Sequence, residues 1–123
     1  MINTFSIQQV ALHTGLTTHT LRYYERIELI GPIQRDETGH RYYTTDDIGW
    51  IELLVRLRTT GMSLEKMKQY ADFQKQGDPT GAKRRQLLEE HETYMLARIS
   101  ELNSCLDAIR FKINIYRQLE NKQ

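Results

Sequence analysis

A heptad repeat of apolar residues fills the last third of the chain and constrains its fold more than any other feature. A helix over residues 82–119 is ~55 Å long at 1.5 Å per residue, and the rest of the chain is too small to bury so long an apolar stripe. The helix can fold back over its own chain or pair with a second copy, and the regular repeat favours pairing. The a and d positions of this seam are Leu88, Met95, Ile99, Leu102, Leu106, Ile109, Ile113 and Tyr116.

The length of 123 residues limits the remaining architecture. It allows one compact domain of about 70 residues beside an extended element, but not two ordinary globular domains. The segment Gln-Gly-Asp-Pro-Thr-Gly is rich in helix breakers and predicts a linker and hinge. The expected organisation is a domain over residues 1–75, a linker over 76–81, a coiled-coil dimerisation helix over 82–119 and a tail over 120–123.

Two short helices in tight succession are predicted near the N-terminus. Ser6 and Gln9 form a capping-box pattern that starts the first helix, and Gly15 can end it in a left-handed conformation. Thr17 can cap the second helix, over residues 17–26. Together they form a helix-turn-helix whose second helix has a cationic and aromatic outer face suited to DNA. That face consists of His19, Arg22, Tyr23 and Arg26.

The helix pair is followed by signs of two further projections. Residues 29–43 predict a two-stranded hairpin with a charged tip, which forms a wing beside the second helix. A third helix starts at residues 44–47 and ends at Gly61, and Ser63 caps a fourth helix, so that this second pair forms a second wing. Trp50 is expected to pack between helices. The predicted fold is a mainly α winged helix-turn-helix domain followed by the dimerisation helix.

Several short motifs follow one another along this region: Leu21-Arg22-Tyr23-Tyr24-Glu25, Gly39-His40-Arg41-Tyr42-Tyr43, Leu57-Arg58 and Gly61-Met62-Ser63-Leu64. In their order and spacing, over about residues 4–73, they resemble the MerR family of bacterial transcription regulators. The resemblance implies a dimer with antiparallel helices on double-stranded promoter DNA, at a pseudo-palindromic operator. It also implies action on RNA polymerase through distortion of the spacer DNA, in response to a signal.

Candidate DNA contacts follow from side-chain chemistry and from the motifs. Arg22 and Tyr23 are expected to contact phosphates, although Arg22 can instead form a salt bridge with Glu25. His19 and Thr20, near the N-terminus of the second helix, are the candidates for reading bases. The full predicted set is Thr17, His19, Thr20, Arg22, Tyr23, Arg26, Arg35, Arg41, Tyr42, Arg58, Ser63 and Lys66.

The total charge gives no indication of nucleic-acid binding. The net charge is +1, and residues 1–60 contain six arginines against seven acidic residues. Most of these arginines, however, cluster in the second helix and the two wings. The local potential, rather than the total charge, must therefore hold the phosphates.

The signal that such a regulator senses is not predicted by the sequence. The closest resemblance is to the small aldehyde- and thiol-stress branch of the family, whose members have a sensor cysteine where this chain has Arg56. The lone cysteine, Cys105, falls at a g position beside the seam, where we expect an inert and partly buried thiol. His91 alone makes no metal site. No metal, cofactor or appended ligand-binding domain is expected.

Other classes of protein are less well supported. No catalytic set of residues occurs at usable spacing, so an enzyme is not expected. A DNA-bending accessory protein without an inducer, similar to excisionases, is the main alternative, and a coiled-coil adaptor is a more distant one. No apolar run approaches the ~20 residues of a membrane span, and the N-terminus lacks a signal-peptide pattern. The expected location is the cytoplasm, with no membrane partner.

Overall fold

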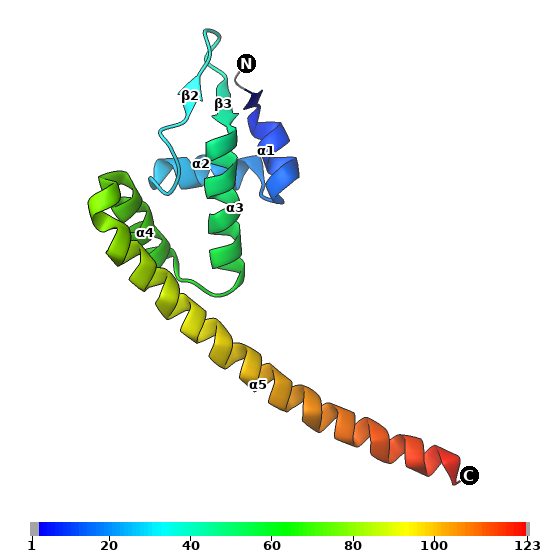
Figure 1. The fold of residues 1–123 in the computed structure, drawn as a ribbon. Helices are drawn as coiled ribbons and strands as arrows, with labels where there is room; N and C mark the ends of the chain where they lie inside the picture. Colours follow the sequence, from blue (N-terminus) through cyan, green and yellow to red (C-terminus); the bar gives the residue numbers. More distant parts are fainter. Residues whose placement is uncertain (1–2, 123) are drawn as a thin grey trace. The chain divides into compact units, whose positions relative to one another are not determined.

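The structure is a computed structural model that describes residues 3–122. The chain divides into two units, the first ending at Arg85 and the second starting at Gln86. The first unit holds a small sheet with helices, and the second is the continuation of one long helix (Figure 1). The elements are β1 (Thr4–Phe5), α1 (Ile7–Thr14), α2 (Thr18–Arg26), β2 (Gln34–Arg35), β3 (Arg41–Thr44), α3 (Thr45–Thr59), α4 (Leu64–Gln76), the 3₁₀ turn η1 (Asp78–Thr80) and α5 (Gly81–Asn121).

The predicted helix-turn-helix is confirmed, together with its caps. The Ser6 hydroxyl accepts a hydrogen bond from the Gln9 amide, and the Gln9 side chain accepts one from the Ser6 amide. Gly15 ends α1 at φ 78°, a left-handed conformation that glycine adopts without steric cost. The Thr17 hydroxyl accepts from the Thr20 amide and so starts α2. Local side chains thus fix the tight turn between α1 and α2.

The first wing is part of a three-stranded antiparallel sheet with the order β1-β3-β2. The pairing of Arg35 with Arg41 closes the predicted hairpin, whose tip extends beyond the helices in Figure 1. On the other edge, Phe5 pairs with Tyr43. Strand β1 was not predicted, because a two-residue strand has no periodicity of its own and forms only by pairing with β3. The extra strand fixes the base of the wing to the start of α1.

The core of the first unit lies where α1 packs against both α2 and α3. Val10, Leu21, Ile51 and Leu54 are completely buried there. The predicted packing role of Trp50 is confirmed. Its Nε1 donates a 2.8 Å hydrogen bond to the Leu29 carbonyl oxygen, and its ring stacks on Tyr70 with the centroids 5.3 Å apart. Trp50 therefore joins α3 to α4 and to the loop after α2.

The segment predicted as a linker forms an ordered turn. Gly77 has φ 83°, and Pro79 lies in η1. The buried Thr80 hydroxyl donates to the Phe73 carbonyl oxygen at 2.5 Å, while Arg84 donates to the Gly77 carbonyl and the Gln74 side chain. These bonds connect α4 to the first turn of α5.

Helix α5 runs for 41 residues, as one continuous helix (Figure 1). Leu87 and His91 are buried, and the His91 ring stacks on Tyr94 with centroids 5.9 Å apart. Further along, six residues of the predicted seam are exposed in the single chain: Ile99, Leu102, Leu106, Ile109, Ile113 and Tyr116. Cys105 is likewise exposed in the single chain, and its expected partial burial beside the seam depends on a partner helix.

Replacing Trp50 with phenylalanine tests the joint between α3 and α4. The substitution removes the indole donor and leaves the carbonyl of buried Leu29 without this partner. We expect a loss of about 1–3 kcal/mol in the free energy of unfolding, measured by urea denaturation at a fixed protein concentration. The control is Leu12→Ala, since Leu12 is 88% exposed and its truncation should change stability by less than about 0.5 kcal/mol. Equal stability of Trp50→Phe and the parent would contradict this role.

Candidate nucleic-acid interface

The outer face of α2 is exposed as the sequence predicts. His19, Arg22, Tyr23 and Arg26 are exposed, whereas Leu21 and Tyr24 on the other side are buried. The Arg26 guanidinium carbon lies 5.7 Å from the centre of the Tyr23 ring, a cation–π distance. The helix therefore presents cationic and aromatic groups to solvent from a firmly packed base.

The threonines at the start of α2 serve the helix itself. The Thr17 hydroxyl accepts from the Thr20 amide and also donates to the Thr20 hydroxyl at 2.9 Å. Thr20 is partly covered, while His19 is exposed. Of the two residues predicted to read bases, His19 is thus the more accessible one.

One ion pair connects the first wing to α2. The Arg41 Nε donates to a Glu25 carboxylate oxygen at 2.7 Å, and the two side chains are only 21% and 24% exposed. From the sequence, Glu25 was instead a possible partner of Arg22. The observed pair could not be foreseen, because it joins residues 16 positions apart that only the folded wing brings together. It fixes the angle between the wing and α2.

The tip of the first wing is organised by Asp36. Its carboxylate accepts hydrogen bonds from the Thr38 amide and hydroxyl and from the His40 amide. These donors, with the Thr38 hydroxyl foremost, hold the pKa of Asp36 below its ordinary value of 3.8. The exposed Arg35 donates to the Gly39 carbonyl oxygen at 2.9 Å. The tip is therefore an ordered loop with Arg35 at its base.

Two tyrosines of the first wing have different roles. The Tyr42 hydroxyl donates to the Gln34 side chain across the hairpin. Tyr43 is completely buried, as expected for a residue that packs the wing onto the core. Its hydroxyl has no hydrogen-bond partner among the described residues, and burial raises its pKa above 10.0.

The second wing is the turn between α3 and α4. Ser63 caps α4 by accepting from the Lys66 amide at 3.1 Å, and an Arg58 terminal nitrogen donates to the Met62 carbonyl oxygen at 3.4 Å. All three predicted contact residues of this wing are exposed. Lys75, which is not among the predicted contact residues, donates from α4 to the Glu28 carbonyl oxygen just after α2. No sequence signal indicates this bond, since it spans 47 positions.

Two other features are absent from the described part of the chain. It contains no group of three His, Cys, Asp or Glu side chains placed to hold a metal ion. It also contains no helix long and apolar enough to cross a membrane. The predicted DNA contacts all fall in the first unit, and the predicted seam falls in the second.

A capped helix pair with two wings defines the class of the protein as a winged helix-turn-helix protein. Comparison with known families is consistent with that class. The family model for the MerR HTH family regulatory protein matches residues 5–74, and the model "MerR, DNA binding" matches residues 49–110. The chain belongs to the MerR family of helix-turn-helix transcriptional regulators.

Individual relatives share most of the chain. An uncharacterized HTH-type transcriptional regulator of Haemophilus influenzae is 34% identical over 94% of this chain and 85% of its own. The HTH-type transcriptional regulator AdhR of Bacillus subtilis is 40% identical over 74% of this chain and 65% of its own. Among solved structures, HiNmlR, a MerR family regulator lacking the sensor domain and bound to promoter DNA, matches with a TM-score of 0.85. It is 34% identical and covers 94% of this chain and 92% of its own.

The order of the wing tip should depend on pH through Asp36. Because its pKa is lowered in the folded protein, the bonds to Thr38 and His40 are present above pH 3.8 and are lost as the pH falls through the lower, folded pKa. The amide NMR shifts of Thr38 and His40 should therefore titrate with a midpoint below 3.8. In the control, Asp36→Asn, this titration of the two amide shifts should be lost. A midpoint at or above 3.8 would argue against this account of the tip.

Proposed function

We propose that the protein regulates transcription by binding double-stranded promoter DNA as a homodimer, with α2 in the major groove and both wings on the backbone. The observation that carries this proposal is the exposed cationic and aromatic face of α2, held at a fixed angle to the wing by the Arg41–Glu25 pair. The promoter-DNA complex of the similar regulator HiNmlR supports it.

The predicted contacts can be assigned by chemistry. Arg22 and Tyr23 meet phosphates from the middle of α2, and His19 reaches base edges from its first turn. Arg41 uses its Nε for Glu25 and keeps its terminal nitrogens as donors for a phosphate. The remaining backbone contacts come from Arg26 on α2, Arg35 and Tyr42 in the first wing, and Arg58, Ser63 and Lys66 in the second.

The dimer is proposed from the apolar stripe of α5. Leu102 and Ile109, one heptad apart, are 58% and 57% exposed in the single chain. Large aliphatic side chains at a and d positions gain stability by entering the holes of a facing helix, and a second copy offers an identical stripe. Antiparallel pairing places the two α2 helices on either side of a two-fold axis. The operator is then a pseudo-palindrome whose half-site spacing follows the dimer.

The proposed effect on transcription is deformation of the promoter. Two recognition helices fixed by one rigid dimer can hold DNA bent or untwisted, which changes the alignment of the promoter elements for RNA polymerase in the cytoplasm. In vitro transcription with purified polymerase separates this function from that of a DNA-bending accessory protein. A regulator changes the transcript yield from its own upstream promoter. An accessory protein bends the DNA but leaves the transcript yield unchanged.

Removing the Arg22 side chain should weaken specific DNA binding. Arg22→Ala loses a charge-assisted contact on the exposed face of α2, so we expect the affinity for the chain's own upstream promoter region to fall by about tenfold or more. Gel-shift titration at fixed salt measures this. The control is Lys122→Ala, which removes one positive charge just after α5, outside the first unit, and should retain parent affinity. Parent-like binding by Arg22→Ala would overturn the assignment of this face.

A charge in the seam should separate the dimer. Leu102→Glu places a carboxylate at a d position, and analytical ultracentrifugation should then show a monomer at concentrations where the parent is a dimer. Operator affinity should fall by about a hundredfold, because the two half-sites are no longer bound together. Ser104→Glu, at the f position of the same heptad, is the control and should remain a dimer. A Leu102→Glu dimer would refute the proposed seam.

A further inference from the structure

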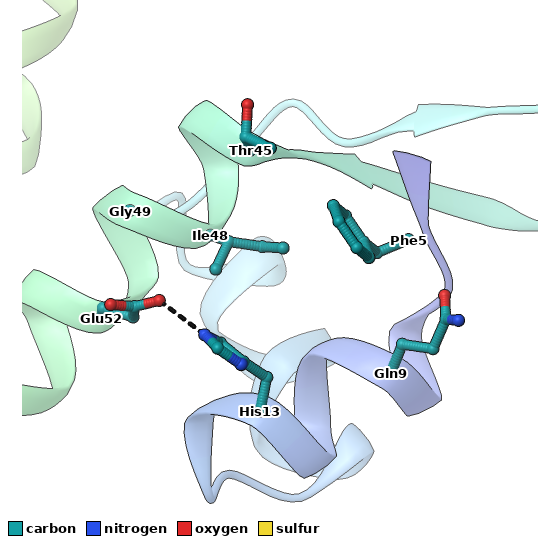
Figure 2. Close-up of a pocket in the computed structure, with 7 residues that line it drawn as sticks. All are labelled: Phe5, Gln9, His13, Thr45, Ile48, Gly49 and Glu52. Atoms are coloured by element: carbon teal, nitrogen blue, oxygen red, sulfur yellow. Dashed lines mark hydrogen bonds and ion pairs between the residues drawn. The ribbon is translucent and has the colours of Figure 1, made fainter. Parts of the chain in front are cut away.

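A pocket of about 530 Å³ lies between α3 on one side and β1 and α1 on the other, within the first unit (Figure 2). This volume falls in the range of small-molecule sites, about 300–1,000 Å³. None of its lining residues belongs to the predicted DNA contacts or to the seam. They are Phe5, Gln9, His13, Thr45, Ile48, Gly49 and Glu52.

The pocket is open partly because Gly49 lacks a side chain. Gly49 lies inside the 15-residue helix α3, where glycine is less favourable than alanine. Its φ is not positive, and a β-carbon built on it would meet nothing within 4 Å. Neither the backbone nor the packing of the described chain therefore requires glycine at this position. The residue leaves space that the described chain does not fill.

The two ends of the pocket differ in chemistry. Ile48 extends toward the Phe5 ring at one end, and the His13–Glu52 pair lies at the other (Figure 2). The His13 Nε2 is 2.8 Å from a Glu52 carboxylate oxygen, and the Glu52 side chain remains 33% exposed. With histidine counted as neutral, Glu52 is the one formally charged residue among those that line the pocket. A carboxylate facing aliphatic and aromatic surface complements an organic cation.

We propose that this pocket binds a compact organic cation, with its ammonium group on the Glu52 carboxylate and its apolar body over Gly49, between Phe5 and Ile48. The Glu52 carboxylate gives selectivity for a positive charge, and the open floor at Gly49 gives room for a ring. Because α1 packs against both α3 and α2, such a ligand lies one helix away from the DNA-facing residues. The inference does not rest on DNA binding.

The test is an amide NMR titration of the full chain without DNA. The probe is 2-phenylethylammonium, with 2-phenylethanol as a neutral analogue and 3-phenylpropionate as an anionic one. We expect saturable shifts at Gln9, His13, Gly49 and Glu52, with the cation bound more tightly than either analogue. Glu52→Gln retains the shape of the side chain but removes its charge. It should weaken the affinity for the cation by about tenfold and change the affinity for 2-phenylethanol by less than about twofold.

A second variant tests the space at Gly49. Gly49→Leu should fill the pocket and abolish binding of the cation, whereas Gly49→Ala keeps most of the space and should retain binding. Dispersed amide spectra and thermal unfolding show that each variant is folded, and if Gly49→Leu does not fold, Glu52→Gln decides alone. The proposal is overturned if the parent shows no saturable shifts at the pocket, if folded Gly49→Leu binds the cation as the parent does, or if Glu52→Gln leaves cation affinity unchanged.

Discussion

The apolar stripe of α5 is the constraint on which the arrangement of this protein depends. Leucine and isoleucine side chains recur every three to four residues from Ile99 to Ile113, and in the single chain they remain exposed. Leaving such a surface in water is unfavourable by roughly 25 cal/mol for each Å² of apolar area that pairing would cover. In the proposed dimer, a second copy covers the stripe, and the protein has two DNA-binding units related by one axis. In this proposal, the same helix determines both the oligomeric state and the spacing of the two DNA-binding units.

Within the first unit, the candidate interface is held by side-chain contacts between different elements. Glu25 fixes Arg41 of the first wing, Lys75 joins α4 to the chain after α2, and Trp50 stacks between α3 and α4. These side chains hold the exposed residues of α2 at fixed positions before any ligand binds. Such preorganisation lowers the entropic cost of binding. Such preorganisation suits the proposed DNA binding of a chain whose net charge is only +1.

Local sequence predicts this fold well wherever a few neighbouring residues determine the structure. The caps at Ser6 and Thr17, the hairpin and the long helix are all of this kind, and all are present. The features that were missed depend on distant segments meeting: β1 on its pairing with β3, and the Arg41–Glu25 contact on the folded wing. The His13–Glu52 pair, 39 positions apart, belongs to the same group. The expected partial burial of Cys105 stays a prediction, because a position beside a seam is covered only once a partner helix is present.

Hydroxyl-radical footprinting on the chain's own upstream promoter region tests the central claim, that one seam holds two recognition helices on one operator. The account predicts two protected patches related by a two-fold axis, with centres separated by a whole number of helical turns of about 10.5 base pairs. It also predicts that both patches appear together as the protein concentration rises. A single protected patch, or two patches that fill at different concentrations, would contradict it.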